Sequence, residues 1–527
     1  MKQYDLIVIG AGPAGLSAAI EAASHGMHVA VFDENARPGG QLFKQIHKFF
    51  GSKEHKAKVR GFRIGQELLQ EAEKQGVEVI LRAAVMGIFP EHELLVRMGD
   101  AMRHEKADAI LIATGASENM VPFPGWTLPG VIGAGAAQTM MNLHGVLPGK
   151  RVLMLGSGNV GLVVGFQLLQ AGCELVGICD MLPRVGGYGV HAAKLSRCGV
   201  PFFTSHTIVR VEGEDHVTGV VLGQVGADRA VVPGTEQHFD VDTVCVAVGL
   251  SPMAQLAQMA GCDMEDNPKK GGCVPVVDAF GETSQAGIFA AGDVAGIEEA
   301  SSAMLEGRIA GIGAACSLGF ISEAQRNEGT AACEKALDSL RQGMFALKNR
   351  GRQLQNTEEG CVLSQNLLQK GFLADDEVER FPGVSRQASV HPVIECTQNI
   401  PCNPCQDACS RHCIRIGQDI TALPSVDETQ TCIDCGLCVA SCSGQAIFLV
   451  DEGFAEGYAA VTLPYEFLPL PKVGDTGMAL GRGGQAVCEA EVVRVRTAPA
   501  FDKTCLLTIR VPSAMAMTAR FFRKEAV

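Results

Sequence analysis

The sequence predicts an α/β fold for the front of the chain, followed by a cysteine-rich domain and a small β domain. Three observations support this prediction. A pattern of strand, glycine turn, helix and strand occurs twice, at residues 5–34 and 151–180. Two cysteine-rich runs lie between residues 396 and 442. The segment 461–512 alternates apolar and polar residues between glycines and prolines, which is typical of strands.

The first α/β unit has the spacing of a dinucleotide-binding turn. "DLIVIG" (5–10) is predicted to be a buried strand, and Gly10, Gly12 and Gly15 follow in the pattern Gly-x-Gly-x-x-Gly. These glycines allow a tight turn, a close approach to a pyrophosphate and close helix packing. Asp33 ends the next strand, where it is placed to accept a hydrogen bond from a ribose. The alternative is a glycine-rich turn in some other α/β protein.

The second unit repeats the same pattern. Gly156, Gly158 and Gly161 form the turn, and Asp180 ends the following strand. An acid at this point favours NAD over NADP, although Arg184 nearby opposes that preference. Tandem units of this kind suggest FAD in the first and NAD(H) in the second. A copy that keeps the fold without binding a ligand stays open as the alternative, because fold alone does not establish function.

Four further motifs extend the pattern through residue 320. They are "PGGQL" (38–42), "ILIATGA" (110–116), "TVCVAVGLSP" (243–252) and "GIFAAGDV" (287–294). With both glycine turns, they resemble the two-dinucleotide-domain flavoproteins of the pyridine nucleotide–disulfide oxidoreductase superfamily. The resemblance implies two Rossmann-like domains, one for FAD and one for NAD. It also implies cofactor-binding positions at Gly40, Gln41, Thr114, Gly115, Gly292 and Asp293, the last on the ribityl chain of the flavin.

The sequence departs from the disulfide reductases of this superfamily. No Cys-x-x-Cys occurs before residue 400, so electrons are not expected to leave the flavin through a local dithiol. The segment "PFPGWTLPGVIGAGAAQTMMN" (122–142) resembles a narrower branch. That branch comprises flavoprotein subunits of hydrogen cyanide synthase, opine oxidase, hydroxyproline dehydrogenase and the sarcosine oxidase alpha chain. The resemblance implies a part of a multi-subunit enzyme that oxidises amines or amino acids.

The second cysteine run has the spacing of a bacterial ferredoxin. Cys432, Cys435, Cys438 and Cys442 follow the pattern Cys-x₂-Cys-x₂-Cys-x₃-Cys, with Ser443 where proline is usual. This spacing favours a [4Fe–4S] cluster. A zinc site, the alternative, usually has two separated Cys-x-x-Cys pairs.

The first run aligns with the second through the residues that follow it. "CSRHCIRI" (409–416) matches "CSGQAIFL" (442–449), which pairs Cys409 with Cys442. Cys402 and Cys405 then match Cys435 and Cys438, and Cys396 matches Cys432 with three extra residues in its loop. Cys413 falls where the second run has Ala446 and is predicted to be a spare. The alternative assigns Cys413 as a ligand and Cys396 as the spare.

The repeated runs predict a ferredoxin-like domain with two [4Fe–4S] clusters. In such domains the fourth cysteine of each run binds the cluster of the other run. Cluster one is therefore assigned Cys396, Cys402, Cys405 and Cys442, and cluster two Cys432, Cys435, Cys438 and Cys409. A flavin can divide an electron pair, whereas a cluster carries one electron at a time, so the two kinds of cofactor suit one electron-transfer chain.

These features give six predicted segments. Residues 1–120 and 271–325 form the two parts of an FAD-binding domain, with an NAD(P)-binding domain at 121–270 between them. A helical connector at 326–390, the ferredoxin-like domain at 391–453 and a small β domain at 454–527 follow.

Composition narrows the partners and the compartment. The chain has 527 residues and a formal net charge of −14, which argues against non-specific nucleic-acid binding. No apolar stretch is long enough for a membrane span, and the apolar start is better explained by the glycine turn than by a signal peptide. We therefore expect a cytoplasmic protein in which most of the scattered cysteines are small buried side chains.

The sequence favours a flavo-iron–sulfur electron-transfer subunit of an amino-acid or amine dehydrogenase, with a proline-, hydroxyproline- or sarcosine-like substrate oxidised by a second flavoprotein subunit. No residue can be assigned as catalytic. One alternative is a stand-alone NADH-dependent reductase that exchanges electrons with ferredoxin or a small oxidant. The other is a non-enzymatic redox scaffold or sensor.

Overall fold

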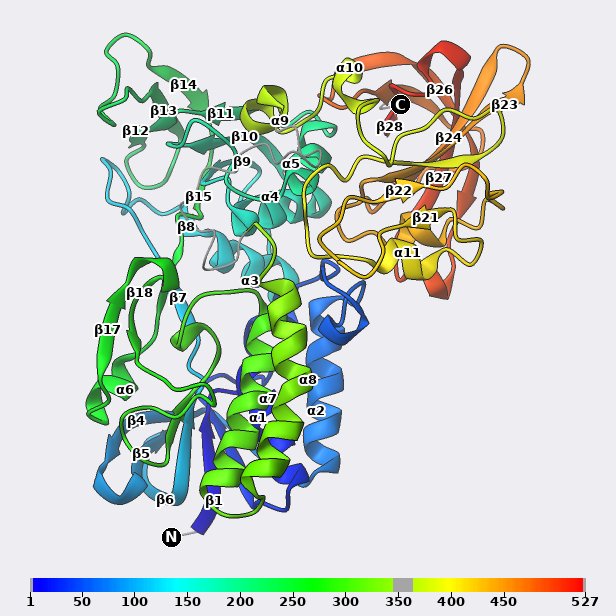
Figure 1. Cartoon of the computed structure of the whole chain (residues 1–527). Helices are drawn as coiled ribbons and strands as arrows, with labels where there is room; N and C mark the ends of the chain where they lie inside the picture. Colours follow the sequence, from blue (N-terminus) through cyan, green and yellow to red (C-terminus); the bar gives the residue numbers. More distant parts are fainter. Residues whose placement is uncertain (1–2, 345–363, 525–527) are drawn as a thin grey trace. The chain divides into compact units, whose positions relative to one another are not determined.

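A computed structural model of the chain describes residues 3–344 and 364–524. The chain divides into two compact units, which are described separately. Unit 1 contains residues 1–119 and 249–352, and unit 2 contains residues 120–248 and 353–527. Figure 1 shows the elements of both units.

Unit 1 is built on a seven-stranded sheet in the order β3-β2-β1-β6-β5-β4, with β19 also paired to β6. Strands β3, β2, β1, β6 and β19 pair in parallel, whereas β4, β5 and β6 pair antiparallel. The strands are β1 (Gln3–Ile9), β2 (Val29–Asp33), β3 (Glu78–Leu81), β4 (Ala83–Phe89), β5 (Glu93–Met98), β6 (Ala101–Ile112) and β19 (Ile288–Ala290). The buried faces of β1 and β2 are rich in Val and Ile, as expected for parallel strands covered on both sides.

Helices pack side by side against this sheet (Figure 1). They are α1 (Pro13–Ser24), α2 (Gly61–Lys74), α7 (Ala300–Ser317) and α8 (Glu323–Leu340). Helices α1 and α7 lie very close together because α7 carries glycines where it meets α1. A Cβ on Gly307 would lie 2.1 Å from the carbonyl oxygen of Ala14, and one on Gly311 would lie 2.4 Å from that of Ala18. This packing fixes the start of α1 over the sheet.

The remaining elements of unit 1 are short. Strand β7 (Ala116–Glu118) pairs with β16 (Leu250–Pro252), and β17 (Met264–Asn267) pairs with β18 (Gly272–Pro275). Helix α6 (Gln255–Met259) lies between these two pairs in sequence. The β7–β16 pair brings together the two places where the chain passes between units.

The first part of unit 2 is a second, smaller parallel sheet in the order β11-β10-β9-β15-β8. Its elements are β8 (Val131–Gly133), α3 (Ala134–His144), β9 (Arg151–Leu155), α4 (Asn159–Ala171), β10 (Glu174–Asp180), α5 (Gly189–Ser196), β11 (Phe202–Thr204) and β15 (Thr243–Val246). An antiparallel sheet of β12 (His206–Glu212), β13 (Gly219–Gln224) and β14 (Gln237–Asp240) is inserted before β15.

The second part of unit 2 joins the cysteine runs to a seven-stranded antiparallel sheet. Its order is β20-β23-β24-β27-β26-β25-β28, formed by β20 (His391–Ile394), β23 (Ile447–Ala455), β24 (Tyr458–Tyr465), β25 (Thr476–Leu480), β26 (Ala486–Arg496), β27 (Cys505–Pro512) and β28 (Phe521–Lys524). The smaller elements are α9 (Gln365–Lys370), α10 (Asp375–Val378), α11 (Pro404–Ala408), β21 (Ile414–Arg415), β22 (Ser425–Val426) and α12 (Leu437–Ser441).

The mixed α/β fold with two glycine-turn units is confirmed. The predicted domain limits stay predictions, although the last sheet uses strands on both sides of the limit at 453/454. Part of the predicted helical connector, residues 345–363, lies outside the described residues. No helix in the described ranges is both long enough and apolar enough to cross a membrane.

Candidate functional site

The first glycine turn connects β1 to α1. Gly10 has a φ of +106°, and a Cβ on it would lie 2.4 Å from the carbonyl oxygen of Ala113. A Cβ on Gly15 would lie 1.9 Å from the carbonyl oxygen of Gly10. Both positions are therefore closed to larger residues by the protein itself. A Cβ on Gly12 would meet nothing within 4 Å, so the space beside Gly12 is open at the N-terminus of α1, where a phosphate is favoured.

Asp33 supports this turn from the end of β2. Its Oδ2 accepts a hydrogen bond of 2.7 Å from the backbone N–H of Ala11. Its Oδ1 accepts from the backbone N–H and the side-chain amide of Asn35 at 2.8 and 2.9 Å. Asp33 therefore braces the glycine turn, and its remaining lone pairs stay available for the predicted ribose contact.

Two more predicted positions lie at the first turn. A Cβ on Gly40 would lie 2.9 Å from Cα of Gly12, so Gly40 is seated directly against the turn, with the exposed Gln41 next in sequence. A Cβ on Gly292 would lie 2.8 Å from Cβ of Ala14. Because Gly292 follows β19 closely, Asp293 lies near the start of α1, and its Oδ1 accepts from the N–H of Glu298 at 3.3 Å. The structure thus brings the 10–15, 40–41 and 292–293 motifs together.

The Thr114-Gly115 motif lies where the chain leaves unit 1. The hydroxyl of Thr114 donates to the carbonyl oxygen of Met253 at 2.7 Å, and the N–H of Met253 donates to the carbonyl oxygen of Gly115 at 2.9 Å. Gly115 has a φ of +74°, a conformation that favours glycine. The motif therefore fastens the outgoing and returning segments to each other.

The second glycine turn reproduces the first in detail. Gly156 has a φ of +108°, and a Cβ on it would lie 2.2 Å from the carbonyl oxygen of Ala247. A Cβ on Gly161 would lie 2.1 Å from the carbonyl oxygen of Gly156, whereas one on Gly158 would meet nothing within 4 Å. Asp180 braces this turn as Asp33 braces the first, since its Oδ2 accepts from the N–H of Ser157 at 2.8 Å.

The loop that follows β10 packs against the second turn. The N–H of Gly186 donates to the hydroxyl of Ser157 at 2.9 Å, and the N–H of Gly187 donates to the carbonyl oxygen of Ser157 at 2.8 Å. The N–H of Tyr188 donates to the side chain of Asn159 at the start of α4. No counterpart of this loop was expected from the sequence, and it narrows the approach to the second turn.

The two cysteine runs have matching local structures. In the first, Cys402 precedes α11, Cys405 lies in it and Cys409 follows it, and Cys435, Cys438 and Cys442 hold the same places around α12. The N–H of Cys413 donates to Sγ of Cys409 at 3.3 Å, and the N–H of Ala446 donates to Sγ of Cys442 at 3.3 Å. The fold therefore repeats the register that aligns Cys409 with Cys442.

The side chains of the two runs also lie close across the repeat. Burial and, after it, the nearby Cys442 raise the pKa of the Cys405 thiol to about 12. Burial likewise raises the pKa of Cys432, and Cys409 of the first run adds to that increase. Six of the eight predicted ligands belong to one apolar core around Val439: Cys396, Cys405, Cys409, Cys432, Cys438 and Cys442. Each fourth cysteine thus faces the run to which it does not belong.

Within the described ranges, no three His, Cys, Asp or Glu side chains converge tightly enough to hold a single metal ion. A four-iron cluster is larger than one ion and stands between its ligands, so its cysteines need to surround a space. Cys413 is 2% exposed and lies next to Cys409 and Cys432. The choice between Cys396 and Cys413 as a ligand stays a prediction.

A buried charged group near the first turn was missed by sequence reasoning. Oε2 of Glu306 on α7 accepts from the N–H of Gly292 at 3.1 Å, and its Oε1 accepts from Arg341 at 2.5 Å. Burial, with Glu298 next, raises the pKa of Glu306 to about 7. No local pattern announces this group, because its members come from α7 and from the segment after α8.

Comparison with known proteins identifies the front of the chain. Residues 4–307 match the family described as pyridine nucleotide-disulphide oxidoreductase. The chain belongs to this family. Its members are FAD-dependent oxidoreductases, so the FAD and NAD(P) predictions fit the family as well as the two glycine turns.

Several curated relatives are parts of larger enzymes. The first of the two opine oxidase chains, from Rhizobium meliloti, is 32% identical over 337 residues, which are 60% of this chain and 64% of that relative. The match thus spans less than two thirds of that relative. Hydrogen cyanide synthase subunit HcnB of Pseudomonas protegens is 27% identical, over 63% of this chain and 75% of its own. The sarcosine oxidase alpha subunit of Corynebacterium sp. is 26% identical, over 61% of this chain and 33% of its own.

Among solved structures, L-proline dehydrogenase from P. horikoshii shares the fold. It superimposes with a TM-score of 0.50 at 22% identity, covering 64% of this chain and 59% of its own. At this identity the match supports the fold and carries no information on the substrate.

Proposed function

We propose that the chain is the FAD- and iron–sulfur-containing electron-transfer subunit of a multi-subunit amine or amino-acid dehydrogenase. The observation that carries this proposal is the pair of mirrored cysteine turns, 409–413 and 442–446, joined to a flavoprotein that has no Cys-x-x-Cys before residue 400. A flavoprotein without its own dithiol needs another route for electrons. Two clusters of the ferredoxin type would supply that route.

The residues of the first turn fit FAD. Gly12 leaves the only open side of the turn within the described residues around it, and the N-terminus of α1 favours a pyrophosphate there. Asp33 and Asp293 are assigned to the ribose and the ribityl chain, and Gly40 and Gln41 to the neighbourhood of the flavin ring. When bound, FAD supplies both two-electron and one-electron chemistry, while the protein orients it.

The partner follows from the relatives rather than from a site in this chain. The opine oxidase relative, HcnB and the sarcosine oxidase alpha chain are each named as one subunit of an enzyme. We propose by analogy a second flavoprotein subunit that oxidises a proline-, hydroxyproline- or sarcosine-like substrate. Electrons would run from it through Cys-bound clusters to the FAD of this chain, and on to NAD or another acceptor.

The deciding experiment compares the isolated chain with the chain co-expressed with its partner subunit. The isolated chain is expected not to oxidise proline, hydroxyproline or sarcosine. Substrate-dependent bleaching of the cluster absorbance should require the partner and should be lost in Cys435→Ser. Unaided oxidation of an amino acid by the isolated chain would contradict the proposal.

A stand-alone NADH-dependent reductase is the second candidate, favoured by the complete second turn with its open Gly158. It predicts rapid NADH oxidation by the isolated chain with a dye or ferredoxin as acceptor. The same assay therefore separates the two functions.

A further inference from the structure

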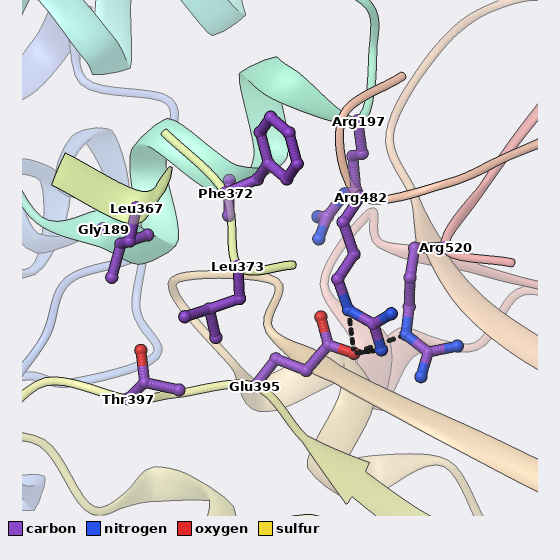
Figure 2. A pocket seen from close by; sticks show the side chains of 10 residues that line it. Gly189, Arg197, Leu367, Phe372, Leu373, Glu395, Thr397, Arg482 and Arg520 are labelled. Atoms are coloured by element: carbon purple, nitrogen blue, oxygen red, sulfur yellow. Dashed lines mark hydrogen bonds and ion pairs between the residues drawn. The ribbon is translucent and has the colours of Figure 1, made fainter. Parts of the chain in front are cut away.

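A buried group of three arginines lies beside the first cysteine run. Arg482 donates to Oε1 of Glu395 from Nε at 3.1 Å and from Nη2 at 2.6 Å, and Arg520 donates to the same oxygen from Nε at 2.5 Å. Arg482 also pairs with Asp375, which is 52% exposed. Figure 2 shows Arg482 and Arg520 meeting at Glu395, with Arg197 on the far side of Arg482.

The positive charge in this arginine group (Arg197, Arg482 and Arg520) exceeds the buried negative charge. Glu395 is the only buried carboxylate that these three side chains contact among the described residues. Arg197, which is 5% exposed, donates from Nη2 to the carbonyl oxygen of Gln445 at 2.9 Å, and it forms no ion pair with any residue in the described ranges. Nη2 of Arg520, which is 1% exposed, is buried without an acceptor. An unbalanced buried charge of this kind is costly unless an anion lies nearby.

The cavity between these side chains cannot hold a large anion. It is lined on one side by Arg197, Arg482, Arg520 and Glu395 and on the other by apolar residues, and has a volume of about 20 Å³. That volume suits about one water molecule. A phosphate or a carboxylate needs several times this space, so the balancing anion lies elsewhere.

Both backbone attachments of the arginine group lead to the same predicted ligand set. Glu395 immediately precedes Cys396, the first ligand of cluster one. Gln445, which binds Arg197, lies in the turn after Cys442, the fourth ligand of cluster one. In that turn the N–H of Gln445 donates to the carbonyl oxygen of Cys442 at 3.1 Å, and the next N–H donates to its Sγ.

We propose that the arginine group is the buried counter-charge of cluster one, with Arg197 as its electrostatic contact from the end of α5. This inference rests on the proposed function. A [4Fe–4S] cluster with four thiolates carries net negative charge and becomes more negative when it is reduced. A buried cation beside it therefore stabilises the reduced state and raises the reduction potential of cluster one relative to cluster two. Arg197 is a positioning residue for charge, not a ligand.

The test is a redox titration of the full chain followed by electron paramagnetic resonance, after iron and sulfide have been counted. Arg197→Met keeps most of the length of the side chain and removes the charge. It is expected to make one of the two clusters at least tenfold harder to reduce, which is about 59 mV for one electron, and to leave the other unchanged. Arg197→Lys should restore most of the potential. Arg510→Met, which removes an exposed arginine paired with Glu491, is the matched control and should shift neither cluster.

A second variant gives the opposite sign and covers loss of folding in Arg197→Met. Glu395→Gln leaves the arginine group less compensated, so cluster one should become easier to reduce. Intact clusters with no shift in either variant would overturn the inference and leave the proposed function standing. A wild-type chain without iron would overturn both. A potential that depends on chloride at fixed ionic strength would also overturn it, because an exchangeable ion would then be the counter-charge.

Discussion

The carboxylate of Asp180 accepts hydrogen bonds from both the backbone N–H and the hydroxyl of Ser157, at 2.8 and 2.5 Å. Ser157 lies inside the second glycine turn, so the acid that was predicted to select NAD also holds the turn in shape. This double role changes how a substitution at Asp180 must be interpreted, because Asp180→Ala removes a structural acceptor as well as a charge.

Asp180→Asn separates the two roles. Its amide oxygen still accepts from the N–H of Ser157, while the negative charge that disfavours a 2′-phosphate is gone. We expect NADH binding to weaken and NADPH binding to be unchanged or stronger, as measured by isothermal titration calorimetry. Asp180→Ala should in addition lower the free energy of unfolding by about 1–2 kcal/mol. Equal weakening of both nucleotides in Asp180→Asn would show that Asp180 does not contact the ribose.

Gly12 and Gly15 should respond differently to alanine. A Cβ on Gly12 meets nothing within 4 Å, whereas one on Gly15 would lie 1.9 Å from a backbone oxygen. Gly12→Ala is expected to give a folded chain with the melting temperature of the FAD-free wild type and little bound FAD. Gly15→Ala should reduce the yield of folded protein. The FAD content per chain, measured after denaturation, checks this difference, and normal FAD in Gly12→Ala would rule out the proposed phosphate position.

The interleaved ligand assignment predicts which iron is lost. The wild type should hold about eight irons, from two four-iron clusters. Cys442→Ser should damage cluster one, and Cys413→Ala should leave the iron content unchanged. Iron analysis with electron paramagnetic resonance distinguishes the clusters. Loss of half the iron in Cys413→Ala would instead favour Cys413 over Cys396 as a ligand.

Glu306 predicts a pH dependence of stability. Its pKa in the folded chain is raised from 4.5 to about 7, so between these values the folded state holds a proton that the unfolded state releases. The free energy of unfolding should therefore fall as pH rises from 4.5 to 7 and then level off. The shift corresponds to at most about 3 kcal/mol, reduced because 22% of the side chain is exposed.

Urea unfolding of the isolated chain at several pH values measures this contribution. Glu306→Gln should flatten the dependence, since it cannot release the proton. Glu328→Gln, at an exposed position on α8, is the control and should keep the wild-type slope. A wild-type slope in Glu306→Gln would mean that another group binds the proton.

The glycine turns could be predicted from sequence because their requirements are local. Gly10 and Gly156 need a positive φ, and Gly15 and Gly161 need close backbone packing, so each turn is written within a few residues. The matched cysteine runs are local in the same way. The sequence also correctly predicted strands in the C-terminal segment.

Long-range contacts could not be predicted in this way. The bond from Arg197 to the backbone of Gln445 joins two segments that share no periodic pattern, and the same is true of Glu306 and Arg341. Pairing of β20 and β23 with the C-terminal strands depends on register between distant segments. The bracing role of Asp180 was missed because the sequence shows the position of an acid and not its hydrogen-bond donors.

The exchange of fourth cysteines between the runs has a consequence for biosynthesis. Cys405 lies with Cys442, and Cys409 lies with Cys432, so in the proposed arrangement each cluster draws on both halves of the repeat. Neither half can mature by itself as the chain leaves the ribosome. Cluster insertion must wait until residue 442 has emerged, and a nascent chain stopped before it would expose unfilled thiols to oxidation.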